Sequence, residues 1–185
     1  MKIIDTGLPE VKIIEPAFFS DARGFFTELF HKEKYSPVTE LDFVQDNMSY
    51  SGYGTLRGLH LQNPNPQGKL VQCLQGCVLD VAVDVRVGSP NFGKSVAVEL
   101  SEFDHRQLYI PPGFAHGFFV TSVHALFMYK CTALYSPEHD MSIAWNDPDL
   151  DIDWLKGKMI KPLVSLKDSK ARRLRDIPVG ELPKY

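Results

Sequence analysis

The sequence predicts an all-β fold, and a jelly roll is the form of it that we expect. Short runs rich in β-branched and aromatic residues recur along the chain, separated by clusters of glycine, proline, asparagine and aspartate. Helical periodicity is confined to short pieces. Many short strands with regular turn signals are typical of sandwiches and barrels, and a jelly roll pairs two sheets around an interior wide enough for a ligand.

The clearest strand signal lies in residues 78–87, where apolar residues alternate with smaller or polar ones. Such alternation predicts a half-buried strand, with one face on the core and the other toward solvent. Other strands are expected in residues 11–19, 24–30, 56–61, 69–74, 95–100, 107–110, 117–121 and 125–134. We expect short peripheral helices at residues 32–35 and 170–176.

Length and composition indicate one globular unit. A chain of 185 residues without a linker rich in Gly, Pro or Ser fits a single domain over residues 1–185 with a short C-terminal extension. Hydrophobic residues make up 44% and charged residues 23%, and the net charge is −3. This charge gives no basic surplus to bind a phosphate backbone, so we expect no nucleic acid partner.

The N-terminus and the cysteines bear on the cell compartment. Charged residues interrupt residues 1–16, and no run approaches the roughly 18 apolar residues that a membrane span needs. Cys73, Cys77 and Cys131 are odd in number and lack a C-x-x-C pair, which argues against a disulfide framework or a thiolate metal site. We expect a cytoplasmic protein with reduced, mostly buried cysteines and no membrane partner.

Residues 55–62, T-L-R-G-L-H-L-Q, place an arginine and a histidine in an otherwise apolar strand. In a regular strand Arg57 and His60 would point to opposite faces, because side chains alternate with a period of two. Gly58 lies between them, where a bulge can re-aim one side chain. We therefore predict a backbone irregularity at Gly58 that lets both side chains reach one pocket.

Several other polar residues have ordinary structural explanations when each is taken alone. Lys69 follows a turn and opens an apolar strand, where a lysine is usually a solvated surface charge. His60 taken alone could be a core histidine bonded to a backbone carbonyl, and His116, which lies among aromatics after a tight turn, could likewise be structural. Tyr129 falls in an alternating apolar strand, and Tyr135 lies close to a proline, so both could serve for packing alone. None of them identifies a function by itself.

Common nucleotide and metal motifs are absent from the sequence. It has no G-x-x-x-x-G-K-[ST] phosphate loop and no G-x-G-x-x-G turn, so neither triphosphate hydrolysis nor a Rossmann cofactor is supported. Metal-binding jelly rolls usually present H-x-H, whereas this chain has His60-Leu61-Gln62. Because metal sites generally need three or four ligands, His60 and His116 make an incomplete set and we expect no metal.

A series of motifs resembles one family along nearly the whole chain. The motifs are F-F-S-D-A-R-G-F-F-T-E, F-V-Q-D-N, L-R-G-L-H, P-Q-G-K-L-V, D-V-A-V-D-V-R, I-P-P-G-F-A-H-G-F, Y-K-C-T-A-L-Y-S-P-E-H-D, W-N-D-P and S-L-K-D. Their order and spacing are similar to those of the dTDP-4-dehydrorhamnose 3,5-epimerases. The resemblance implies a cupin-type jelly-roll homodimer without metal or organic cofactor. The implied substrate is dTDP-4-dehydro-6-deoxyglucose, inverted at C3 and C5 to give dTDP-4-dehydro-L-rhamnose.

The same resemblance implies roles for residues at matching positions. His60 matches the general base, Tyr129 the acid on the opposite sugar face, Asp168 the carboxylate that orients His60, and Lys69 the cation beside the C4 oxygen. The positions that hold the nucleotide, diphosphate or sugar match Arg23, Glu28, Gln45, Asn47, Arg57, His116, Tyr135, Asp140 and Lys167. Tyr135 matches the aromatic that stacks on thymine. Asp140 departs from the glutamate of some members.

Proton transfer next to a ketone explains why such residues are needed. A C4 ketone acidifies the C3 and C5 protons because the carbanion delocalises onto the carbonyl oxygen. The reaction needs a base and a cationic or hydrogen-bonding group at that oxygen. A histidine held by a carboxylate is a suitable base, and inversion needs a second group on the other face. By periodicity alone, Asp80 and Asp84 are rival partners for His60; the resemblance favours Asp168.

Three alternatives stay open from the sequence. A relative that inverts only C3 or only C5 in another deoxysugar pathway would share these residues. A metal-dependent cupin oxygenase or isomerase is disfavoured by the missing H-x-H. A non-catalytic jelly roll would bind the nucleotide sugar without exchanging its protons.

Overall fold

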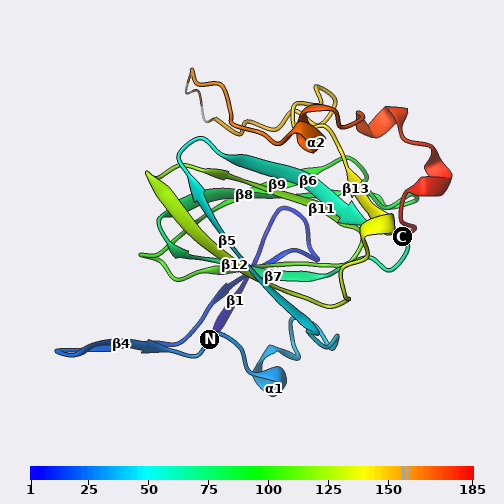
Figure 1. Cartoon of the computed structure of the whole chain (residues 1–185). Coiled ribbons are helices and arrows are strands. Elements are labelled where there is room, and N and C mark those ends of the chain that lie inside the picture. The colour runs from blue at the N-terminus through cyan, green and yellow to red at the C-terminus, as the bar shows by residue number, and fades with distance from the viewer. Residues whose placement is uncertain (156, 158) are drawn as a thin grey trace.

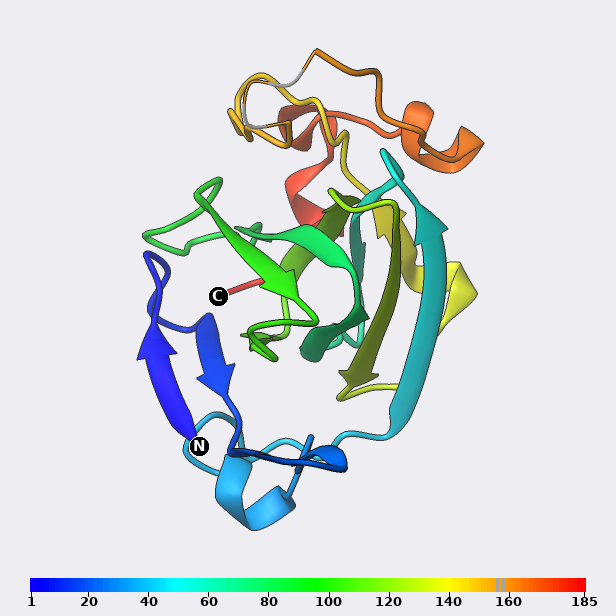
Figure 2. The ribbon, with the colours of Figure 1, turned by 90° about the vertical axis from the view of Figure 1, so that its left-hand side faces the viewer.

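Two antiparallel sheets pack face to face and form the body of the protein (Figures 1 and 2). The computed structural model describes residues 1–155, 157 and 159–185. The six-stranded sheet has the order β1 (Lys2–Asp5), β2 (Lys12–Glu15), β10 (Gln107–Ile110), β7 (Lys69–Gln75), β12 (His124–Cys131) and β5 (Gln45–Gly52). The five-stranded sheet has the order β13 (Asp140–Ser142), β6 (Leu56–Gln62), β11 (Phe114–Val120), β8 (Cys77–Asp84) and β9 (Ser95–Ser101). This architecture confirms the predicted jelly roll.

A separate hairpin extends from the body. It consists of β3 (Phe18–Asp21) and β4 (Gly24–Thr27), which pair only with each other among the described strands. Figure 1 shows this hairpin on the left of the molecule, whereas β13 lies on the right. Pro16 separates β2 from β3, so the single strand expected over residues 11–19 is two strands in different sheets.

The helices are short, as predicted, but the predicted position of one of them is wrong. Helix α1 (Lys32–Tyr35) has the expected bounds. The helix expected at residues 170–176 is wrong: α2 (Leu166–Ser169) precedes it, and only Leu174–Asp176 form a 3-10 turn, η2. Arg172 lies between them in a bridge to Ile143, and this pairing excludes a helical backbone there. Two more 3-10 turns are η1 (Pro137–His139) and η3 (Val179–Glu181). None of the described helices is long and apolar enough to cross a membrane.

Three strands lie outside the predicted set: β1, β5 and β13. β5 has the sequence Q-D-N-M-S-Y-S-G, which lacks the apolar alternation of a core strand. It is an edge strand that pairs with β12 on one side only among the described strands, so solvent can accept its polar side chains.

The prediction of a half-buried strand at residues 78–87 is wrong, because β8 is covered on both faces. Val78 and Ala82 face the core between the sheets, whereas Leu79, Val81 and Val83 belong to a second apolar cluster. That second cluster also includes side chains of the C-terminal segment, namely Leu150, Trp154, Leu174, Ile177 and Leu182. The C-terminal segment therefore forms a third layer over the outer face of the five-stranded sheet (Figure 1).

A buried arginine fixes the end of this third layer. The Arg86 guanidinium donates to the Asp84 carboxylate, with Nε–Oδ1 at 3.0 Å and Nη2–Oδ2 at 2.7 Å, and also to Glu10. Its Cζ lies 4.6 Å from the ring centroid of Phe114 and 4.8 Å from that of Tyr185. Burial raises the pKa of Asp84, but the Arg86 hydrogen bonds outweigh it and hold the pKa below its usual range. Arg86 therefore links Tyr185 to Asp84 at the end of β8.

Removing this cation should destabilise the fold strongly. We expect Arg86→Met to lower the free energy of unfolding by about 3 kcal/mol, because the fully buried Asp84 carboxylate loses its cationic partner, although the hydrogen bond from Ser89 remains. Urea unfolding checks this value. Arg106→Met is the matched control: its partner Glu15 is partly exposed, so the loss should stay below about 1 kcal/mol. Equal losses in the two variants would contradict the prediction.

Candidate active site

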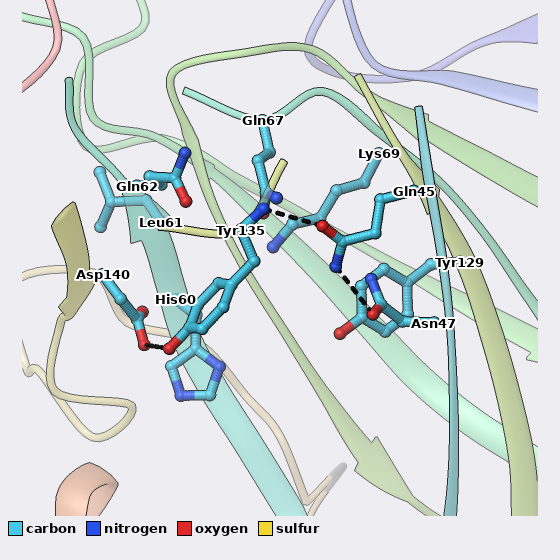
Figure 3. A pocket seen from close by; sticks show the side chains of 10 residues that line it. All are labelled: Gln45, Asn47, His60, Leu61, Gln62, Gln67, Lys69, Tyr129, Tyr135 and Asp140. Atoms are coloured by element: carbon cyan, nitrogen blue, oxygen red, sulfur yellow. Dashed lines mark hydrogen bonds between the residues drawn. The ribbon is translucent and has the colours of Figure 1, made fainter. Parts of the chain in front are cut away.

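A cavity of about 290 Å³ lies between residues of the two sheets (Figure 3). This volume is at the lower end of the range usual for small-molecule sites. Its lining residues are Gln45, Asn47, His60, Leu61, Gln62, Gln67, Lys69, Tyr129, Tyr135 and Asp140. Seven of the residues predicted from the sequence to form a site are in this list: Gln45, Asn47, His60, Lys69, Tyr129, Tyr135 and Asp140.

The predicted irregularity at Gly58 is confirmed. His60 pairs with His116 and Arg57 with Phe118, so β6 carries an extra residue against β11 at this point. Gly58 has a φ of 132°, which favours glycine. The Arg57 guanidinium reaches Ser51 Oγ on the opposite sheet, at 3.2 and 3.1 Å. The bulge thus turns Arg57 and His60 toward the space between the sheets.

His60 is held by a carboxylate from the third layer. Its Nε2 lies 2.6 Å from Asp168 Oδ1, and Asp168 is buried in the first turn of α2. Ser165 caps this helix by accepting the Asp168 backbone N–H at 3.0 Å. Burial raises the pKa of Asp168, but hydrogen bonds with His60, Ser165 and the Gly58 backbone outweigh it and keep the pKa below its usual range. A stable carboxylate therefore orients the half-buried imidazole.

The two rival carboxylates have other partners. Asp80 lies 2.9 Å from His116 Nε2, and both side chains are buried. Asp84 bonds to Arg86, as described above. Burial lowers the pKa of His116, and the nearby Asp80 opposes that shift. In the described part of the chain, no three His, Cys, Asp or Glu residues are grouped so that they could hold a metal ion.

Lys69 and Tyr129 come from the six-stranded sheet, across the cavity from His60 (Figure 3). Lys69 is only 9% exposed, so it is not a solvated strand-end charge. Its Nζ lies 6.0 Å from the Tyr129 ring centroid. Burial lowers the pKa of Lys69 and raises that of Tyr129, and the charge of Arg57 partly offsets the second shift. The cavity thus has an imidazole on one wall and an ammonium and a phenol on the other.

Tyr135 and Asp140 line the outer part of the cavity. The Tyr135 hydroxyl donates to Asp140 Oδ2 at 2.9 Å, and Lys167 Nζ donates to the same oxygen at 2.6 Å. Tyr135 is 53% exposed, so one side of its ring is open to a ligand. Asp140, which is shorter than the glutamate of some family members, therefore accepts hydrogen bonds from Tyr135 and Lys167, two other residues of the predicted site.

Two glutamines outside the predicted set of site residues organise the segment before Tyr135. Gln62 Nε2 donates to the carbonyl oxygen of Leu134, and its Oε1 accepts the Ser136 backbone N–H. Gln67 Nε2 donates to the Ala133 carbonyl oxygen at 2.8 Å. A buried glutamine at the end of an apolar strand is the signal that could have identified Gln62.

Arg23 and Glu28 lie outside this cavity. Arg23 is at the turn of the β3–β4 hairpin, where its guanidinium bonds to Asp21. Glu28 follows β4 and accepts from Lys34 Nζ at 2.7 Å. Within one copy of the chain, the hairpin points away from the wall that carries Asp140 (Figure 1).

Comparisons with known proteins agree on one family. The family model for dTDP-4-dehydrorhamnose 3,5-epimerase matches residues 5–176. A protein of that name from Sinorhizobium fredii is 47% identical over 94% of this chain and 89% of its own length. A crystal structure of the 3,5-epimerase of Legionella pneumophila, in complex with dTDP-4-keto-L-rhamnose, has a TM-score of 0.96 and 50% identity, covering 100% of this chain and 98% of that one. A 3'-monoepimerase from Streptomyces bikiniensis, bound to dTDP-quinovose, has a TM-score of 0.89 and 34% identity, covering 98% and 92%.

The bulge that aims His60 depends on a residue without a side chain. A Cβ at Gly58 would lie 2.6 Å from Gly117 Cα and 2.9 Å from the His116 carbonyl oxygen, and the backbone has a positive φ. We expect Gly58→Ala to lower the free energy of unfolding by about 3 kcal/mol, since neither backbone can move away easily. Gly7→Ala, which meets nothing within 4 Å, should change it by less than about 0.5 kcal/mol. Urea unfolding of both variants checks this, and a loss below 1 kcal/mol for Gly58→Ala would contradict it.

Proposed function

The chain belongs to the dTDP-4-dehydrorhamnose 3,5-epimerase family, and we propose that the cavity between its sheets is the active site. The protein epimerises dTDP-4-dehydro-6-deoxyglucose at C3 and C5, giving dTDP-4-dehydro-L-rhamnose. The observation that supports this site most directly is that His60 and Tyr129 line one cavity from different sheets. Inversion needs groups on both faces of the sugar ring, and such a cavity provides them.

His60 is the general base in this proposal. Because its Nε2 is bonded to Asp168, Nδ1 is the nitrogen that takes the proton from C3 or C5. The carboxylate fixes the orientation of the ring and stabilises the imidazolium that forms. Asp168 acts only through His60, so it is a positioning residue.

Lys69 and Tyr129 complete the reaction from the other wall. As the proton leaves, negative charge develops on the C4 oxygen, and the buried Lys69 ammonium stabilises it. The surrounding protein strengthens this attraction because it has replaced water. Tyr129 then donates its hydroxyl proton to the carbon from the face opposite His60. The phenol must be protonated for this step, and burial, which raises its pKa, favours that form.

The nucleotide part of the substrate lies along the outer cavity in this proposal. Tyr135 stacks its ring on thymine, a use that suits its exposed face. The polar contacts to the nucleotide sugar come from Gln45, Asn47, Arg57, His116, Asp140 and Lys167. Of these, His116 is buried against Asp80, so it acts from beneath the cavity.

A homodimer would explain the residues that lie outside the cavity. Phe19, Phe25 and Phe26 of the hairpin are between 62% and 68% exposed, and such an apolar patch is typical of an interface. We infer that a second copy covers this hairpin and that Arg23 and Glu28 reach the partner's cavity. The three free cysteines, two of them buried, support a reducing, cytoplasmic location.

Solvent exchange separates the two proposed proton-transfer groups. We expect His60→Ala to abolish uptake of deuterium at C3 and C5 of the substrate and to lower kcat by about 10²–10⁴. Tyr129→Phe should let exchange continue while epimerisation falls, because the proton can leave but is not replaced from the other face. Proton NMR in deuterated buffer measures both, and the product's coupling constants report the inverted carbons.

Two positions that do not line the cavity supply the controls. His124→Ala at the opposite end of β12 and Tyr53→Phe in a turn should leave both rates within about two-fold. Retained exchange in His60→Ala would remove His60 from the base role. Binding of the nucleotide sugar by the unaltered protein without any exchange would instead favour the non-catalytic alternative.

A mixed dimer tests where Arg23 acts. Each of the variants Arg23→Ala and His60→Ala should have low activity alone. When the two are co-assembled, a hairpin that serves the partner's cavity gives one site with both residues intact, so activity should return. If each hairpin served its own cavity, neither site would be intact and activity would stay low. Activity after co-expression with two different affinity tags checks this.

A further inference from the structure

A chain of hydrogen bonds connects the buried thiol of Cys131 with the segment that carries Tyr135. Asn47 Nδ2 donates to Cys131 Sγ at 3.6 Å, and Gln45 Nε2 donates to Asn47 Oδ1 at 3.0 Å. The backbone N–H of Tyr135 donates to Gln45 Oε1 at 2.8 Å. Figure 3 shows the last two of these contacts along the cavity.

The chain runs from the core to the surface beside the catalytic groups. Cys131 is 0% exposed and is the direct strand partner of Lys69 on β7 and of Gln45 on β5. Asn47 is the strand partner of Tyr129. Tyr135, at the other end, is 53% exposed.

Each link depends on the orientation of the one before it. A carboxamide has an oxygen that only accepts and an NH₂ group that donates. If Asn47 lost its acceptor at sulfur and its amide reversed, its NH₂ would meet the NH₂ of Gln45. Gln45 would then reverse too and turn a donor toward the Tyr135 N–H. A change at the thiol therefore reaches the segment that carries the exposed ring.

We propose that Cys131 is a positioning residue that sets the orientation of Asn47 and Gln45 and, through them, the place of Tyr135. Burial raises the pKa of the Cys131 thiol, outweighing the opposing effects of Lys69 and Asn47, so the sulfur is a neutral acceptor. The consequence for binding rests on the proposed function, in which Tyr135 stacks on thymine. Cys131 thus links the nucleotide end of the cavity to the strand position beside Lys69.

Two substitutions of similar size separate this role from packing. Cys131→Val fills the space without an acceptor, whereas Cys131→Ser keeps one. We expect Cys131→Val to weaken binding of dTDP about five-fold and to raise KM similarly, with kcat within about two-fold, since one hydrogen bond is lost. Cys131→Ser should bind dTDP with an affinity within about two-fold of that of the unaltered protein. Its free energy of unfolding should be no higher than that of Cys131→Val, because a buried hydroxyl is costly. Isothermal titration with dTDP, steady-state kinetics and urea unfolding give these values.

Hydrogen exchange of the Tyr135 amide in the protein without ligand tests the chain itself. Its exchange rate should rise several-fold in Cys131→Val and return toward the original value in Cys131→Ser. An unchanged rate in Cys131→Val, or a dTDP affinity that follows unfolding stability and not the acceptor, would overturn the proposal. If the unaltered protein failed to bind dTDP, the proposed function would fail, while the amide exchange would still decide the role of Cys131.

Discussion

The close approach of β6 and β11 at two glycines is the constraint on which the site depends. Gly58 and Gly117 face each other so tightly that a Cβ on Gly117 would lie 2.7 Å from the Arg57 carbonyl oxygen and 3.1 Å from Gly58 Cα. The bulge at this point places Arg57 and His60 on the inner side of the sheet. It also brings the Gly58 backbone to Asp168, so the same feature orients the imidazole and stabilises its carboxylate partner.

The two sheets contribute different functional groups to opposite walls of the cavity. His60 comes from the five-stranded sheet, and Lys69 and Tyr129 come from adjacent strands of the six-stranded sheet. The proposed base and acid are therefore held apart by the separation of the two sheets, so a sugar ring bound between them would be reached on both faces. The third layer adds Asp168 from outside the sandwich. In the proposed mechanism, residues of all three layers contribute to proton transfer.

The two histidine–carboxylate pairs, His60–Asp168 and His116–Asp80, differ in how deeply the imidazole is buried. The His60 side chain is 34% exposed and opens to the cavity, whereas the His116 side chain is 7% exposed against a fully buried Asp80. An imidazole with access to the ligand can exchange a proton, and a buried one is better suited to a fixed hydrogen bond. Periodicity alone could not assign these pairs, because it left Asp80 and Asp84 as rival partners for His60.

The sequence by itself determined the fold class and the family. Strand periodicity and turn residues are local properties, and the motifs extend over nearly the whole chain. It also predicted the irregularity at Gly58, since two inward polar residues three positions apart cannot share a face of a regular strand. Periodicity left Asp80 and Asp84 as rivals, and the family resemblance favoured Asp168; only the tertiary structure shows the bond itself, because Asp168 lies 108 positions away in the chain. It also decided that the strand expected to be half-buried is covered on both faces, since the covering segment comes from the far end of the sequence.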